Sequence, residues 1–141
     1  MFALGFPLLL VPFAIFNIIA FLMPGLSWTG ALTTVHMVSG SEWSMSIGDM
    51  LIGFAIVVLF GEMMKATRIG IRTVVDHGLS LLLFLVMLVE FILVKQAATA
   101  TFFLLLIIGI VDVMGGFAIT LRSAQRDLTV EGTVPNITTS Q

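Results

Sequence analysis

Long apolar runs, separated by shorter polar segments, dominate the pattern of this chain. A helix needs roughly 20 residues to cross a hydrocarbon core of about 30 Å. The third apolar run, residues 79–94, reaches that length only if the helix continues past Lys95, whose side chain would extend outward to the interface. Because a lone strand would leave its backbone unpaired in lipid, each run is expected to be helical. The pattern therefore predicts an all-α bundle of four transmembrane helices, at about residues 2–23, 47–66, 79–97 and 101–121.

The composition favours a membrane protein and excludes several kinds of chemistry. Of the 141 residues, 59% are hydrophobic and 10% are charged, whereas soluble domains carry about 25% charged residues. No cysteine is present, so disulfides, thiolate nucleophiles and cysteine metal sites are excluded. Phosphate-binding loops, metal-ligand patterns and catalytic triads are also missing from the sequence. We therefore expect no enzyme activity, no cofactor, no metal and no nucleic-acid partner.

Local signals mark the ends of the first two helices. Pro12 lies inside the first run, where it would free the carbonyl of Leu8 and kink the helix. Pro24-Gly25 ends that run. Ser46 and Asp49 match the Ser-x-x-Asp pattern of a capping box, so the second helix is predicted to start there.

Basic residues gather in the central loop and at the start of the tail. The loop from Pro24 to Ser46 has no Lys or Arg. The basic residues of the other two segments are Lys65, Arg68, Arg72, Arg122 and Arg126. The positive-inside rule then places both termini and the central loop in the cytoplasm. We expect a multi-pass integral protein, N-in and C-in, of a bacterial cytoplasmic membrane rather than a eukaryotic one.

Residues 1–121 are expected to form a single transmembrane domain. The polar tail, 122–141, is expected to be disordered in the cytoplasm. The outer loop is bracketed by Trp28 and Trp43, whose indoles favour the membrane interface. It is too polar to span and too apolar for a free linker, so we expect it to lie along the outer surface.

Charged residues also follow a helical spacing at the end of the second run. They are Glu62, Lys65, Arg68, Arg72 and Asp76. At 100° per residue, all of them fall within an arc of about 100°. This spacing predicts that the second helix continues into the cytoplasm with an exposed charged stripe. The stripe would form ordinary ion pairs or contact anionic lipids, although its three cations are fewer than the 4–8 of a typical lipid site.

Asp112 lies near the middle of the fourth run, where a carboxylate costs roughly 2.5–3.5 kcal/mol to insert. Small and polar residues share its helix face at steps of three and four: Gly109, Gly116, Thr120 and Ser123. Such spacing lets another backbone approach closely. Asp112 is therefore expected to face protein, with a hydrogen bond to Asn17 or to a carbonyl near Pro12. Glu90, in the third run, is a second intramembrane acid.

Two function classes fit these residues. In the first, which we favour, Asp112 fixes helix packing in a structural or accessory subunit of a membrane assembly. In the second, Asp112, with Glu90 and Asn17, binds a proton or cation in an oligomeric channel or coupled transporter. Four helices can hardly enclose a pathway alone, so that alternative requires oligomers. The partners expected in either case are the lipid bilayer and further copies of the chain or a larger membrane complex.

Overall fold

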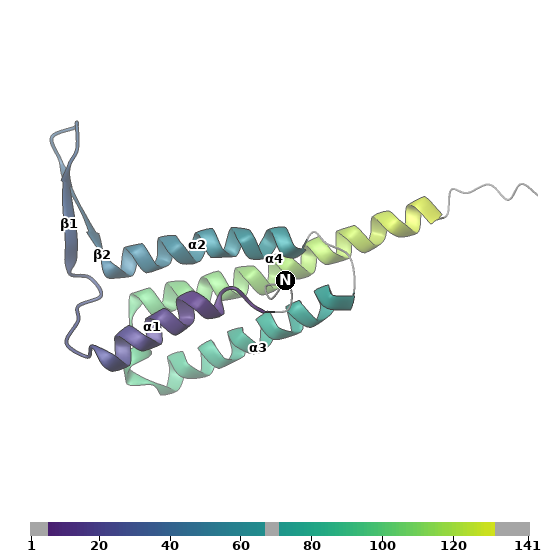
Figure 1. Ribbon diagram of the computed structural model, residues 1–141, viewed down its shortest axis with the longest axis horizontal. Coiled ribbons are helices and arrows are strands. Elements are labelled where there is room, and N and C mark those ends of the chain that lie inside the picture. Colours follow the sequence, from purple (N-terminus) through teal and green to yellow (C-terminus); the bar gives the residue numbers. More distant parts are fainter. Residues whose placement is uncertain (1–5, 67–70, 132–141) are drawn as a thin grey trace, which may run out of the picture.

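Three long helices and one shorter helix lie side by side in the part of the chain that the structure describes (Figure 1). It is a computed structural model and describes residues 6–66 and 71–131. In chain order the elements are α1 (Leu10–Leu22), β1 (Ala31–His36), β2 (Glu42–Ser46), α2 (Ile47–Ala66), α3 (Ile71–Leu93), the 3-10 turn η1 (Lys95–Ala97) and α4 (Ala100–Glu131). The end of the bundle that carries β1 and β2 is called the hairpin end below. There α2 and α4 begin and α3 ends.

Three of the described helices are long and apolar enough to cross a membrane. They are α2 with 20 residues, Val75–Leu93 of α3 with 19 and Ala100–Arg122 of α4 with 23. Helix α1 has 13 residues, which extend about 20 Å at 1.5 Å per residue. It therefore falls short of a hydrocarbon core of about 30 Å. Three of the four expected spans therefore correspond to helices long and apolar enough to cross a membrane, and α1 covers only part of the first run.

Prolines explain the late start of α1. Pro7 disfavours helical backbone at the residue before it, and the N–H of Leu10 donates to the Pro7 carbonyl at 3.0 Å. Pro12 then lies in the first turn of α1, where its missing N–H removes no helical bond. The carbonyl of Leu8 accepts the N–H of Val11 at 3.0 Å. The free Leu8 carbonyl expected from the sequence is therefore wrong, because the helix begins at Leu10.

An aromatic cluster forms the core near the hairpin end. Phe16 of α1 and Phe102 of α4 are fully buried, with ring centroids 4.8 Å apart. The Trp28 indole stacks on Phe16 at 4.4 Å. Met87 and Leu105 fill the next part of the core, where α4 packs against α3. Trp28 thus packs on the core, whereas Trp43 of β2 is exposed.

The loop between α1 and α2 contains a β-hairpin that the sequence did not predict. Strands β1 and β2 pair antiparallel, from Ala31 opposite Ser46 to His36 opposite Glu42. The turn uses Gly40 at φ 83°, a backbone angle that favours glycine. The hairpin runs across the helix axes rather than along them and stands out from the bundle (Figure 1). Strand β2 leads directly into α2.

The start of α2 agrees with the sequence, whereas the expected charged stripe and the expected tail are both corrected. The capping box is present: the Asp49 N–H donates to Ser46 Oγ at 3.1 Å, and the Ser46 N–H donates to Asp49 Oδ2 at 2.9 Å. However, α2 and α3 run in opposite directions (Figure 1), so Glu62 on α2 and Asp76 on α3 do not lie on one continuous helix. The expected tail is not disordered throughout, because α4 continues to Glu131; residues 132–141 lie outside the described chain.

Candidate functional site

Buried polar side chains from α2, α3 and α4 meet in the half of the bundle away from the hairpin. They surround a cavity of about 10 Å³, which is roughly the size that one water molecule needs. Glu62 and Asp112 are only 6% and 4% exposed. The lining residues are Glu62, Lys65 and Ala66 from α2, Asp76 and His77 from α3, and Asp112 and Gly116 from α4. This group, with Ser80 and Thr120 beside it, is called the polar cluster.

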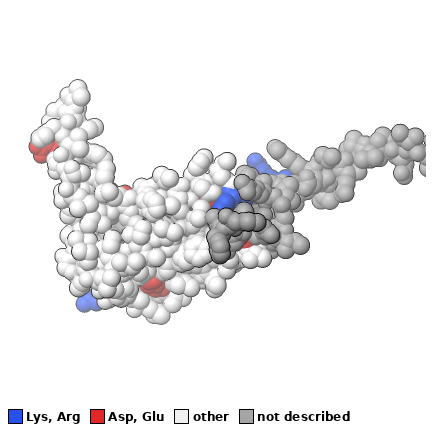
Figure 2. Space-filling view, viewed as in Figure 1, with Lys and Arg blue, Asp and Glu red and all other residues white. Residues whose placement is uncertain are grey.

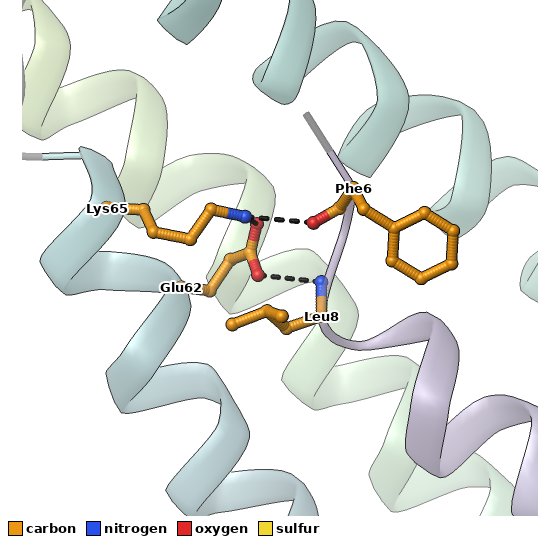
Figure 3. A network of polar contacts seen from close by, with 4 residues as sticks. All are labelled: Phe6, Leu8, Glu62 and Lys65. Atoms are coloured by element: carbon orange, nitrogen blue, oxygen red, sulfur yellow. Dashed lines mark hydrogen bonds and ion pairs between the residues drawn. The ribbon is translucent and has the colours of Figure 1, made fainter. Parts of the chain in front are cut away.

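Glu62 and Lys65 tie the start of α1 to the end of α2 (Figure 3). The two side chains form an ion pair at 3.1 Å. The N–H of Leu8 donates to Glu62 Oε2 at 2.8 Å, and Lys65 Nζ donates to the carbonyl of Phe6 at 2.9 Å. Backbone N–H groups at a helix start have no partner within the helix. Glu62 therefore supplies an acceptor that the surrounding apolar side chains cannot.

Burial of Glu62 and Lys65 corrects the charged stripe expected from the sequence. Their side chains are only 7% and 16% exposed, so they face protein rather than cytoplasm. Arg68 and the side chain of Arg72 lie outside what the structure describes. Asp76 is partly buried on α3, and its Oδ1 has no hydrogen-bond partner among the described residues.

Asp112 faces α2 and α3, not α1. Ser80 of α3 lies beside it, and Glu62 and Lys65 of α2 line the same cavity. The predicted bond from Asp112 to Asn17 is wrong. The Asn17 amide instead donates to its own helix, at the Phe13 carbonyl, and to Glu90.

His77 joins α3 to α4 at the edge of the cavity. Its Nε2 lies 2.6 Å from Thr120 Oγ1. The Thr120 hydroxyl donates to the carbonyl of Gly116 at 3.0 Å, so its lone pair is free to accept the Nε2–H of the imidazole. Gly116 faces the same ring, and a Cβ there would lie 2.6 Å from His77 Cε1. Gly109, also on this face of α4, meets Phe84 and Met87 of α3.

Glu90 and Asn17 form a second polar contact nearer the hairpin end. Asn17 Nδ2 lies 3.4 Å from Glu90 Oε2, while Glu90 Oε1 is buried without a hydrogen-bond partner among the described residues. Both side chains line an open, largely apolar groove of about 530 Å³. Lys95 lies in a different hollow, with Gln96 and Thr99. The structure thus separates Glu90 from Asp112, which the sequence had grouped together.

The sequence contained a signal for the burial of Glu62. The buried residues of α2 follow one helix face: Gly48, Leu51, Ala55, Glu62 and Ala66. Glu62 is therefore in register with small residues that let α4 approach closely. The roles of His77 and Ser80 had no comparable signal, since they depend on which face of α3 meets α4.

Chemically, the polar cluster can stabilise helix packing or hold a proton or a small cation. Its described side chains include three carboxyl groups, one ammonium and one imidazole. Burying such groups is tolerated only where they are paired and hydrogen-bonded. Among the described residues, no group of three or more His, Asp or Glu side chains is arranged to hold a metal ion. Comparison with protein-family models, curated protein sequences and solved structures finds no match for this chain.

Proposed function

We propose that this protein is a structural or accessory subunit of a membrane assembly. The supporting observation is that side chains of the polar cluster are held within the chain. Glu62 binds the backbone before α1, His77 contacts Thr120, and Asp112 is buried beside α2 and α3. We further propose a bacterial cytoplasmic membrane, with the hairpin end outside, because Lys65 and Arg122 lie toward the opposite end.

An apolar core between the two polar sites supports this role over that of a pore. Asp112 lies 12 residues into α4 and Glu90 three residues from the end of α3. At 1.5 Å per residue these positions are about 18 Å and 5 Å from the hairpin end. Met87 of α3 and Leu105 and Ile108 of α4 are buried at the levels in between. Within one copy of the chain, the described side chains therefore offer no continuous polar route between the two sites.

Association is the direct test of this proposal. The protein is extracted in a mild detergent and its mass is measured by native mass spectrometry, with membranes cross-linked before extraction as a parallel sample. A subunit is expected to appear with further copies of itself or with other membrane proteins in both samples. A monomer in both would contradict the proposal.

The polar cluster supports one alternative, an oligomeric channel or a proton- or cation-coupled transporter. Three carboxyl groups against one ammonium give the described cluster a net negative charge when all are ionised. A bound proton or monovalent cation would remove one of these two net negative charges. In this alternative Asp112 is the coupling group, and Asp112→Asn abolishes flux without loss of assembly.

A further inference from the structure

The β1–β2 hairpin has one apolar and one polar face. Residues directly opposite in an antiparallel pair share a face, and the faces alternate along each strand. The pairs Val35–Trp43 and Thr33–Met45 therefore share one face, and Thr34–Ser44 and His36–Glu42 share the other. Val35 is 46% and Trp43 48% exposed, so the described chain leaves the outer part of the apolar face largely open, while Met45 at its base is half-buried.

The apolar face looks back toward the side of the bundle. Figure 2 shows the acidic surface of the hairpin on the side that faces away from the helices. Met45, which shares the face of Val35 and Trp43, is half-buried, whereas Ser44 on the other face is exposed, so the apolar face is the one turned toward the bundle. The face of Val35 and Trp43 is therefore directed toward the level at which the helices enter a membrane.

The position of the hairpin matches the depth of the interface between lipid and water. Strand β2 ends at Ser46 and α2 starts at Ile47, the first residue of a membrane-spanning helix. The hairpin leaves this point across the helix axes (Figure 1). Strands of this length extend about 17–20 Å, so the hairpin reaches beyond the helices, over lipid. Its outer edges carry backbone groups without partners, which need water or headgroups rather than hydrocarbon.

We propose that the hairpin lies flat on the bilayer, with the face of Val35 and Trp43 in the boundary between headgroups and acyl chains. The face of His36 and Glu42 remains in water, where the two side chains pair at 3.3 Å. The partner is the lipid surface itself. Because residues 24–46 include no Lys or Arg, attraction does not depend on anionic lipids. The inference requires α2 to span the bilayer and is independent of the proposed role as a subunit.

Spin labelling tests the arrangement residue by residue. The chain has no native cysteine, so single cysteines at residues 33, 34, 35, 43, 44 and 45 can each carry a nitroxide. The protein is placed in phosphatidylcholine nanodiscs, with and without phosphatidylglycerol. The accessibility of each label to oxygen, which concentrates in lipid, is compared with that to a water-soluble nickel complex. A label at Val57, an exposed residue of α2, reports whether that helix is in the bilayer.

The expected result is that the preferred reagent alternates from residue to residue along each strand. Labels at 33, 35, 43 and 45 favour oxygen and those at 34 and 44 favour nickel, equally in both lipid mixtures. Preference for nickel at every hairpin position, while the Val57 label reports lipid, would overturn the proposal. Exclusion of both reagents from the apolar face would also overturn it, since that face would then be covered by protein.

Fluorescence gives a second readout without labels. In a Trp28→Phe background, Trp43 is the remaining tryptophan, and brominated lipids are expected to quench it more than aqueous iodide does. Exchanging the two side chains, with W43S and S44W together, moves the indole to the other face at constant composition. Iodide should then become the stronger quencher. The same quenching before and after the exchange would contradict the assigned faces.

Discussion

The fit of His77 against Gly116 gives a sharp test of how α3 and α4 pack. A Cβ at residue 116 would lie 2.6 Å from Cε1 and 2.9 Å from Nδ1 of His77, closer than Cβ atoms approach their neighbours in proteins. The ring is held by its 2.6 Å contact with Thr120. To make room for a methyl group, the ring must leave that contact or α3 must move. We therefore expect Gly116→Ala to destabilise the bundle.

Three effects set the size of the destabilisation caused by Gly116→Ala. Overpacking costs about 1–3 kcal/mol, and losing the hydrogen bond to Thr120 costs about 0.5–1.5 kcal/mol. Alanine regains about 1 kcal/mol through its helix propensity. Together these values give a loss in the free energy of unfolding of about 0.5–3.5 kcal/mol, with about 2 kcal/mol as the central expectation.

The neighbouring glycine is a matched control. A Cβ at Gly115 would lie 2.7 Å from Cε of Met63. That atom ends a flexible side chain, which can turn away at little cost. Gly115→Ala keeps the same gain in helix propensity, so its effect is expected to stay within about 1 kcal/mol. Reversible unfolding in mixed micelles of mild detergent and dodecyl sulfate, followed by circular dichroism, measures both variants. Equal stabilities for the two would refute the packing of His77 against Gly116.

Three further predictions use the same unfolding measurement. Thr120→Val should lower the free energy of unfolding by about 1 kcal/mol. The double variant with Gly116→Ala should lose less than the sum of the two single losses, because both changes disrupt the contact between His77 and Thr120. Strict additivity would count against that shared contact. Glu62→Leu should lower the free energy of unfolding by about 3 kcal/mol, since it leaves the Leu8 N–H without its acceptor and the Lys65 ammonium without its ion-pair partner. Glu62→Gln keeps an acceptor and should cost less than half as much; the reverse order would contradict the contacts of Figure 3. Ser46→Ala removes the capping box of α2 and should cost about 1 kcal/mol, and an unchanged stability would mean that the box does not form in the membrane.

Helix α2 was the element best predicted from sequence. A continuous apolar run and a capping box at Ser46 both specify its start, and its range, Ile47–Ala66, agrees with the expected span. Such agreement arises because local propensity and the lipid environment favour the same boundaries. The first run lacks that consistency. Pro7 interrupts it near its start, and α1 is shorter than the hydropathy alone suggested.

The polar cluster was harder to predict because its geometry is set by packing between helices. Spacing on a single helix predicted that Asp112 shares a face with small residues, and in the structure Asp112 and Gly116 line one cavity with residues of α2 and α3. The same reasoning assigned Glu62 to solvent, since it grouped the acid with nearby cations rather than with Ala55 and Ala66. Which side chain then meets Asp112 depends on the rotation of α3, which no local pattern in the sequence fixes.

The hairpin was missed although its alternation is visible in the strands. Thr33, Val35, Trp43 and Met45 occupy one face, with more polar residues between them. Each strand has only five or six residues, and isolated two-stranded hairpins are marginally stable in water. On our proposal, the hairpin can stand out from the bundle because the bilayer surface, rather than protein, covers the face of Val35 and Trp43.

The role of Asp112 is tested most directly by proton and cation flux in liposomes, with wild type and Asp112→Asn compared at the same oligomeric state. The substitution keeps the size and hydrogen-bonding capacity of the side chain but removes the titratable proton. A structural subunit predicts no flux above that of empty liposomes from either protein, and an Asp112→Asn variant that still folds and assembles. Flux from the wild type that disappears in Asp112→Asn would contradict this account and establish the polar cluster as a transport site.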